Sequence, residues 1–418
     1  MANKLYIFIS MNICKIGGSE QYMFNKLCYL EQNGFDVFIF SGMWGEIRIS
    51  AFNRFKECII PAVMYSPSLF KNREVSLIID KIAEKTHIIN YDECIIESDG
   101  IAEAQWGEIL AERFKKKHVL LNVQENHNYS QSEREFIRFK YSRREVSGIA
   151  KSSIKMMLND ESVTVYPWCV FSAHCNNVVA DVPDEYSSMF WDNAFTIGSI
   201  GRIEKPFVAR MIELLAIYFK KHENEKFNLI FVGGEKQKGV LKQIKKHIGV
   251  LDNVNVILTG LLYPISRSLL LSIDFFISSA GSSVVSFYEK RPTLTVHPNT
   301  CEPAGIIGDS FILNRDSMFN PIKSKNIIDF LDDFRAGKTN INYDVDYNTE
   351  EIERIMKKDF TIQLSNVYSS EKQCDYYDIS SIYNNSMKHT IYRIIGKLCG
   401  SYKLQKTLDF YRKIVNNQ

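Results

Sequence analysis

The stretch that most constrains this chain runs from Thr196 to Phe207. A β-rich segment ends at Gly201, a short loop follows with Arg202 and Lys205, and Pro206 opens a helix-patterned run that continues to residue 222. Proline favours the first position of a helix, and a helix N-terminus attracts anions. Apolar residues at helical spacing give this helix a core-facing side (Phe207, Met211, Leu214, Leu215 and Tyr218). The pattern predicts an anion-binding loop on a rigid unit. An ordinary strand-loop-helix whose two cations are merely solvated would have the same sequence pattern.

Strand-like and helix-like segments alternate along most of the chain. Strands are expected at residues 4–10, 36–41, 93–97 and 118–123 in the first half, and at 195–200, 228–232, 254–258, 275–278 and 293–296 in the second. Strands separated by helices pair in parallel through right-handed crossovers. A chain of 418 residues also exceeds one ordinary core. The sequence therefore predicts an α/β protein with two Rossmann-like domains.

Composition excludes several classes of protein. Hydrophobic residues make up 45% and charged residues 24% of the chain, as in soluble globular proteins. The formal charge of +2 gives no overall field that would attract nucleic acid. The nine cysteines are scattered, without a C-x-x-C pair or a histidine cluster at metal-binding spacing, which predicts reduced thiols and no metal site. We expect a cytoplasmic protein, because no apolar run has the length of a signal peptide core or a spanning helix.

Two glycines follow the first predicted strand. Gly17 and Gly18 precede Ser19, a plausible N-cap of the helix expected over residues 20–32. Backbone amides at such a turn can open toward a ligand. The alternative is the glycine-rich first turn that any doubly wound domain can carry.

The strand expected at residues 118–123 ends in a polar segment with Glu125 and His127. Open α/β sheets bind ligands at the carboxyl ends of their strands, so both residues occupy a functional position. His127 is a candidate catalytic residue near an acceptor or a transferred group. A polar loop that caps residues 129–151 explains the same residues equally well.

A second glycine turn lies in the block from Asp274 to Val296. Gly281, Ser282 and Ser283 form a tight turn onto a helix N-terminus, whose amides and dipole can receive a negative group. Glu289, further along the same helix, is a candidate for binding a ribose or sugar hydroxyl. It is also explained as a surface residue near the helix end.

Three of these segments resemble GT-B glycosyltransferases of the family-4 type. Residues 198–205 (GSIGRIEK) are similar to the "vGRl-x-x-eKg" element that opens their donor domain, and residues 17–20 (GGSE) to their "GG-x-E" loop. The block at 274–292 resembles the donor-domain segment that runs from an aspartate through a glycine turn to a proline. It departs from the family in one respect: the second glutamate of the E-x7-E pattern would fall on Val285 or Ser286.

The resemblance implies a GT-B fold, with two Rossmann-like domains facing across a cleft and helices at the C-terminus. Expected domains are residues 1–185 on the acceptor side, 186–380 for the nucleotide-sugar donor, and 381–418 as helices packing back on the first domain. The implied reaction transfers a hexose from a nucleoside diphosphate sugar, UDP-linked, to a glycan or lipid-linked glycan in surface polysaccharide synthesis, with retention and without a metal. Implied catalytic residues are His127, Arg202 and Lys205; implied donor-binding residues are Gly17, Gly18, Arg202, Lys205, Gly281, Ser282, Ser283 and Glu289.

Two other functions fit the same sequence. A nucleotide-sugar epimerase on this fold would need acid and base carboxylates at the site. A non-catalytic partner that stabilises an active transferase would explain the missing glutamates. Residues 387–418 carry seven Lys or Arg against one acidic residue, with apolar residues at helical spacing. A membrane contact through Lys388–Lys413 is therefore expected beside packing on the first domain.

Overall fold

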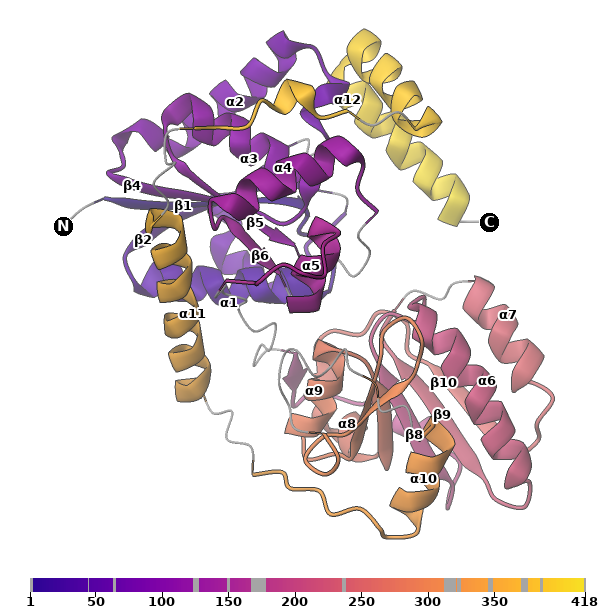
Figure 1. Ribbon diagram of the computed structural model, residues 1–418. Coiled ribbons are helices and arrows are strands. Elements are labelled where there is room, and N and C mark those ends of the chain that lie inside the picture. The colour runs from indigo at the N-terminus through magenta and orange to yellow at the C-terminus, as the bar shows by residue number, and fades with distance from the viewer. Residues whose placement is uncertain are drawn as a thin grey trace. The chain divides into compact units, whose positions relative to one another are not determined.

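The computed structural model describes residues 3–43, 45–62, 65–122, 128–148, 151–166, 178–234, 238–311, 321, 325–344, 349–369, 375–383 and 386–416. The chain forms two compact units, one of residues 1–173 and 347–417 and one of residues 174–346 (Figure 1). Each unit contains its own six-stranded sheet. In the part of the chain described, no helix has the length and apolar character needed to cross a membrane.

The sheet of the first unit is parallel throughout, in the order β3-β2-β1-β4-β5-β6. Its strands are β1 (Lys4–Asn12), β2 (Phe35–Gly42), β3 (Ile59–Pro61), β4 (Glu93–Ser98), β5 (Lys117–Asn122) and β6 (Val146–Gly148). The helices around it are α1 (Gly18–Gln32), α2 (Asn72–Thr86), α3 (Ile101–Phe114), α4 (Gln131–Ser142) and α5 (Lys151–Leu158), with 3-10 turns η1 (Ser50–Cys58), η2 (Pro67–Leu69) and η3 (Ile88–Asn90). The switch point of this sheet lies between β1 and β4, because the strands that follow these two lie toward opposite edges of the sheet. Doubly wound sheets bind ligands at such a point.

The sheet of the second unit follows the order β10-β9-β8-β12-β13-β14. Its strands are β8 (Phe195–Ile200), β9 (Phe227–Val232), β10 (Val254–Leu258), β12 (Phe275–Ser278), β13 (Thr293–Val296) and β14 (Pro303–Ile306); a short pair, β7 (Val179–Ala180) and β11 (Ile265–Ser266), lies outside it. The helices are α6 (Pro206–Lys221), α7 (Lys238–His247), α8 (Arg267–Leu271), α9 (Gly281–Tyr288) and α10 (Ile327–Arg335), with a 3-10 turn η4 (Ser187–Met189). The five predicted strands are confirmed. The antiparallel edge strand β14 was not predicted.

Helix α11 (Thr349–Ser369) joins the first unit, although the sequence analysis placed residues 347–380 in the second domain. The Phe360 ring lies 5.7 Å from that of Phe35 and 6.3 Å from that of Tyr6, measured between centroids. Gln363 accepts a hydrogen bond from Lys26 at 2.8 Å and donates one to Glu97 at 3.0 Å. Because these partners belong to β1, β2, α1 and β4 and are all buried, the helix completes the core of the first unit.

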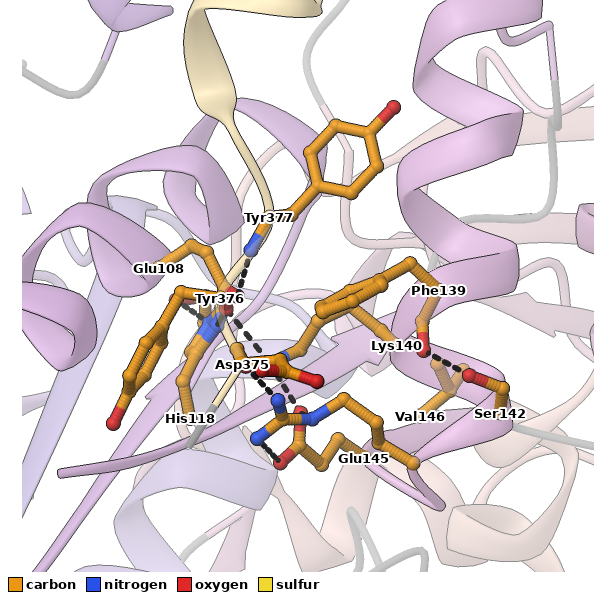
Figure 2. A network of polar contacts seen from close by, with 12 residues as sticks. Glu108, His118, Phe139, Lys140, Ser142, Glu145, Val146, Asp375, Tyr376 and Tyr377 are labelled. Carbon is orange, nitrogen blue, oxygen red and sulfur yellow. Dashed lines mark hydrogen bonds and ion pairs between the residues drawn. The ribbon is translucent and has the colours of Figure 1, made fainter. Parts of the chain in front are cut away.

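A buried polar network holds the segment after α11 against the same unit (Figure 2). Glu108 of α3 accepts hydrogen bonds from Lys140 of α4 at 2.8 Å and from the backbone amide of Tyr377 at 3.0 Å, and its other partner is the His118 ring at 2.9 Å. Lys140 also pairs with Glu145. Burial alone would raise the pKa of Glu108, but the Lys140 ammonium and the His118 hydrogen bond hold it well below its usual range. Glu108 is therefore an anion within this network.

The last helix, α12 (Met387–Asn416), is kinked at Gly400 and packs on η2. A side chain at Gly396 would clash with the backbone carbonyl of Leu69, so helix and turn approach each other closely here. Past the kink, Leu404 and Leu408 enter the core beneath the first sheet, exposed by only 0% and 5%. One face of α12 is thus committed to the first unit.

Candidate functional site

The loop after β8 is shaped by a glycine. Gly201 has a φ of 126°, a conformation that side chains rarely allow. A Cβ placed there would lie 3.3 Å from the hydroxyl of Ser282, so this loop runs directly against the first turn of α9. Lys205 occupies the N-cap of α6 and Pro206 its first helical position. The structure thereby brings together two predicted elements, the Arg202–Lys205 loop and the Gly281 turn.

A third loop joins them from the end of β9. Gly233 and Gly234 have φ values of 101° and 80°. A Cβ at Gly234 would lie 2.6 Å from the backbone nitrogen of Ile203, so only glycine lets this loop pack so closely. The sequence analysis did not assign these glycines to the site. The sequence signal that could have found them is a glycine pair directly after the buried strand β9.

The first turn of α9 is strained and rich in hydroxyls. Ala280 has a φ of 53° and a ψ of −137°, outside the ordinary regions for a residue with a side chain. The hydroxyls of Ser282 and Ser283 donate to the carbonyls of Ser279 and Ala280, at 2.7 and 2.6 Å. The Ser279 hydroxyl is buried without a hydrogen-bond partner among the residues that the structure describes. Strain and an unsatisfied hydroxyl at a helix N-terminus are features of a ligand site.

The charges at this site favour an anion. The Arg202 side chain is 59% exposed, and its Nη1 lies 3.4 Å from Oε1 of Glu204, at the long end of a hydrogen bond. Two cations against one carboxylate leave the loop with a net charge of +1 (Arg202, Lys205 and Glu204). The N-termini of α6 and α9 add partial positive charge. No group of three His, Cys, Asp or Glu residues suited to a metal ion occurs in the described ranges.

Glu289 lies apart from these residues. It follows α9 as its C-cap, roughly 12 Å along the helix from Gly281 at the usual rise per residue. Its carboxylate accepts a hydrogen bond from Arg267 at 2.9 Å, and Arg267 in turn pairs with Asp181. This ion pair gives Glu289 a structural role, and its contact with a donor stays a prediction.

In the first unit, a carboxylate occupies the Gly17–Gly18 turn. A Cβ at Gly17 would lie 2.7 Å from Glu20 Oε2, so the missing side chain makes room for that acid. Glu20 is buried, and a carboxylate there already faces the N-terminus of α1. The turn is thereby better suited to hydroxyl groups than to a phosphate. His127 and Glu125 lie outside the described residues.

A cluster of three acids (Glu20, Asp99 and Glu103) lies at the β1/β4 switch point. Asp99 follows β4 and accepts a hydrogen bond from the Ser10 hydroxyl at 3.0 Å. Burial, then the charges of Glu103 and Glu20, raise the pKa of Asp99 well above its usual value. Burial raises the pKa of Glu103 to about 8, and one of its oxygens has no partner among the described residues. The cluster therefore keeps carboxyl protons at neutral pH. No sequence motif marked it.

This cluster makes the stability of the protein depend on pH. The pKa of Glu103 is raised from 4.5 to about 8. Between these two pH values the folded state holds a proton that the unfolded state releases. Glu103 therefore lowers the stability of the fold increasingly as the pH rises through this range. We expect Glu103→Gln to have a flatter melting temperature between about pH 5 and 8.5 than the wild type. Glu112→Gln, exposed on the same helix, is the matched control. Identical pH profiles for Glu103→Gln and wild type would contradict the assignment.

Comparison with known proteins shows similarity in structure but not in sequence. No model of a protein family and no curated protein matches the chain. A glycosyltransferase from Rickettsia africae ESF-5 superposes with a TM-score of 0.54 and 15% identity over 100% of both chains. Anabaena Alr3699/HepE in complex with UDP gives a TM-score of 0.53 and 13% identity, covering 87% of this chain and 95% of that one.

UDP-GlcNAc 2-epimerase from Neisseria meningitidis, bound to UDP-GlcNAc, gives a TM-score of 0.45 at 13% identity, covering 85% of this chain and 99% of that one. At such identities the similarities show the fold alone. Two doubly wound sheets, matched over at least 87% of the chain by the Rickettsia glycosyltransferase and by HepE, confirm the predicted fold class: the protein has a GT-B fold.

Proposed function

We propose that the protein is a glycosyltransferase that moves a hexose from a nucleoside diphosphate sugar to a glycan or lipid-linked glycan acceptor. The observation that carries this proposal is the contact between the Gly201 loop and the first turn of α9. Because Lys205 is the N-cap of α6 and the Gly201 loop lies against the first turn of α9, the loop that carries Arg202 and Lys205 neighbours two helix N-termini, which supports a role in binding an anion. A departing diphosphate needs this kind of preorganised positive environment.

The finer parts of the proposal have separate support. UDP as the nucleotide is supported by the HepE complex with UDP, a protein of the same fold. Retention, a role for His127 at the acceptor side and a place in cytoplasmic surface polysaccharide synthesis come from the family-4 resemblance. Arg202 and Lys205 would compensate the negative charge of the leaving diphosphate, which a metal ion compensates in other transferases. Gly17 and Gly18 would border the sugar.

A nucleotide-sugar epimerase is the second candidate, and the acid cluster favours it. Epimerisation moves protons at the sugar, which requires carboxyl groups that can both hold and accept a proton. Asp99 and Glu103 meet that requirement through their raised pKa values. In a transferase the same groups could instead deprotonate the acceptor hydroxyl. Product analysis distinguishes the two, because only the epimerase changes the donor without an acceptor.

The first experiment is a thermal-shift screen with nucleotide sugars. A donor present at about 100 times its dissociation constant stabilises the folded state by about 2.7 kcal/mol, so a cognate UDP-sugar should clearly raise the melting temperature. AMP is the control. Incubation with the binding sugar, with and without oligosaccharide acceptors, then separates transfer from epimerisation. If no nucleotide sugar raises the melting temperature, the non-catalytic partner becomes the better interpretation.

A further inference from the structure

Helix α12 exposes apolar side chains that the core does not use. Met387, Ile391, Ile394 and Leu398 follow one another at intervals of three or four residues, so they lie on one side of the helix. Their exposed fractions are 81%, 48%, 55% and 77%. We call these four residues the outer stripe. Other large exposed apolar residues exist, but here four of them are contiguous on one helix face.

The outer stripe lies opposite the face that docks on the first unit. Gly396, which contacts η2, is roughly half a turn of helix away from the stripe at 3.6 residues per turn. Tyr392 and Ile395 pack against the core beneath the first sheet. Other residues of α12 therefore make its contacts with this core.

The charges beside the stripe indicate what can cover it. Lys388 and Lys397 are exposed roughly a quarter turn to either side of it. Arg393 adds a third cation, and no acidic residue occurs between positions 387 and 408. A second copy paired through the same stripe would bring like charges together. An apolar stripe flanked by cations instead matches an anionic lipid surface, where the apolar residues enter the headgroup boundary and the lysines contact phosphates.

We propose that the outer stripe of α12 lies in the surface of an anionic lipid membrane, with Lys388 and Lys397 at the phosphates. This inference refines the membrane contact expected from Lys388–Lys413 and rests on the proposed function, since a lipid-linked acceptor is presented at such a surface. What the inference adds is that the apolar outer stripe, as well as the basic residues, contacts the membrane. Vesicle binding needs no donor, so its failure is distinguishable from failure of the transfer reaction.

The test is co-sedimentation of the full-length protein with phosphatidylcholine vesicles that contain phosphatidylglycerol. We expect binding to these vesicles, weaker binding to pure phosphatidylcholine, and a decrease with added salt. The double variant Ile394→Glu, Leu398→Glu should bind about tenfold more weakly or worse, because charged groups cannot enter the apolar boundary. Removing one flanking charge with Lys397→Gln should weaken binding about fivefold. Melting temperatures should stay unchanged, since all three residues are exposed.

The matched control is Leu77→Glu, Ile89→Glu. Both residues belong to the first unit and are exposed by 59% and 73%, so this variant has the same net charge as the stripe variant but keeps the stripe. It should retain nearly wild-type binding. Equal losses in the two double variants would reduce the effect to net charge and overturn the proposal. The proposal would also be overturned if the wild-type protein did not bind anionic vesicles. The same holds if the wild type sedimented as a dimer and became monomeric when the stripe is changed.

Discussion

Lys205→Ala should lower the rate of sugar transfer by about two to three orders of magnitude. A preorganised positive group facing a leaving diphosphate is typically worth about 3 to 4 kcal/mol in the transition state. Lys205 stands at the N-cap of α6, where the loop is fixed by Gly201 and Gly234. The backbone that carries this side chain is therefore fixed before the reaction begins. The measurement is steady-state turnover with the donor identified by thermal shift.

Companion variants separate this role from a structural one. Arg202→Lys should also impair transfer, because an ammonium cannot reproduce the planar guanidinium against a phosphate. Lys220→Ala, in the last turn of the same helix, is the matched control and should leave turnover unchanged. Stability should change by no more than about 0.5 kcal/mol, as is usual for surface substitutions. Wild-type turnover and nucleotide affinity in Lys205→Ala would reduce this loop to a structural element.

The sequence predicts the second unit well because its central strands are buried on both faces. Apolar runs such as residues 229–232 and 275–277 have few alternatives to a parallel sheet, and the structure has the fully buried strands β9 and β12 at those positions. Strands that lack such a run were missed. β14 reads Pro-Ala-Gly-Ile, and β3 and β6 have three residues each, so no periodic pattern can develop.

Features that depend on distant contacts were beyond a reading of the sequence. The assignment of α11 to the first unit depends on where Phe360 and Gln363 find partners, hundreds of positions away in the chain. At the candidate site, the sequence predicted Arg202, Lys205 and the Gly281 turn individually. It could not identify Asp99 and Glu103, because a raised pKa comes from burial among other acids and leaves no mark on residue spacing.

Glu108→Ala should destabilise the first unit by about 3 to 5 kcal/mol, because it leaves a buried cation without its full compensation. Glu108 and Glu145 (Figure 2) balance Lys140 and Arg143. The side chains of these four residues are at most 3% exposed. Hydrogen exchange of the β5 amides measures the opening of this unit by itself. Glu112→Ala, exposed on the same helix, should change exchange little.

A double variant tests whether the loss comes from the unpaired charge. Adding Lys140→Met to Glu108→Ala removes the surplus cation, so the double variant should be more stable than the sum of the single effects predicts. Strictly additive losses would instead assign the cost to packing. Because Glu108 also accepts the Tyr377 amide at 3.0 Å, its removal should accelerate exchange at residues 375–377 beyond the change in β5. Faster exchange there would show that the acid both balances the core charges and ties the C-terminal segment to the first unit.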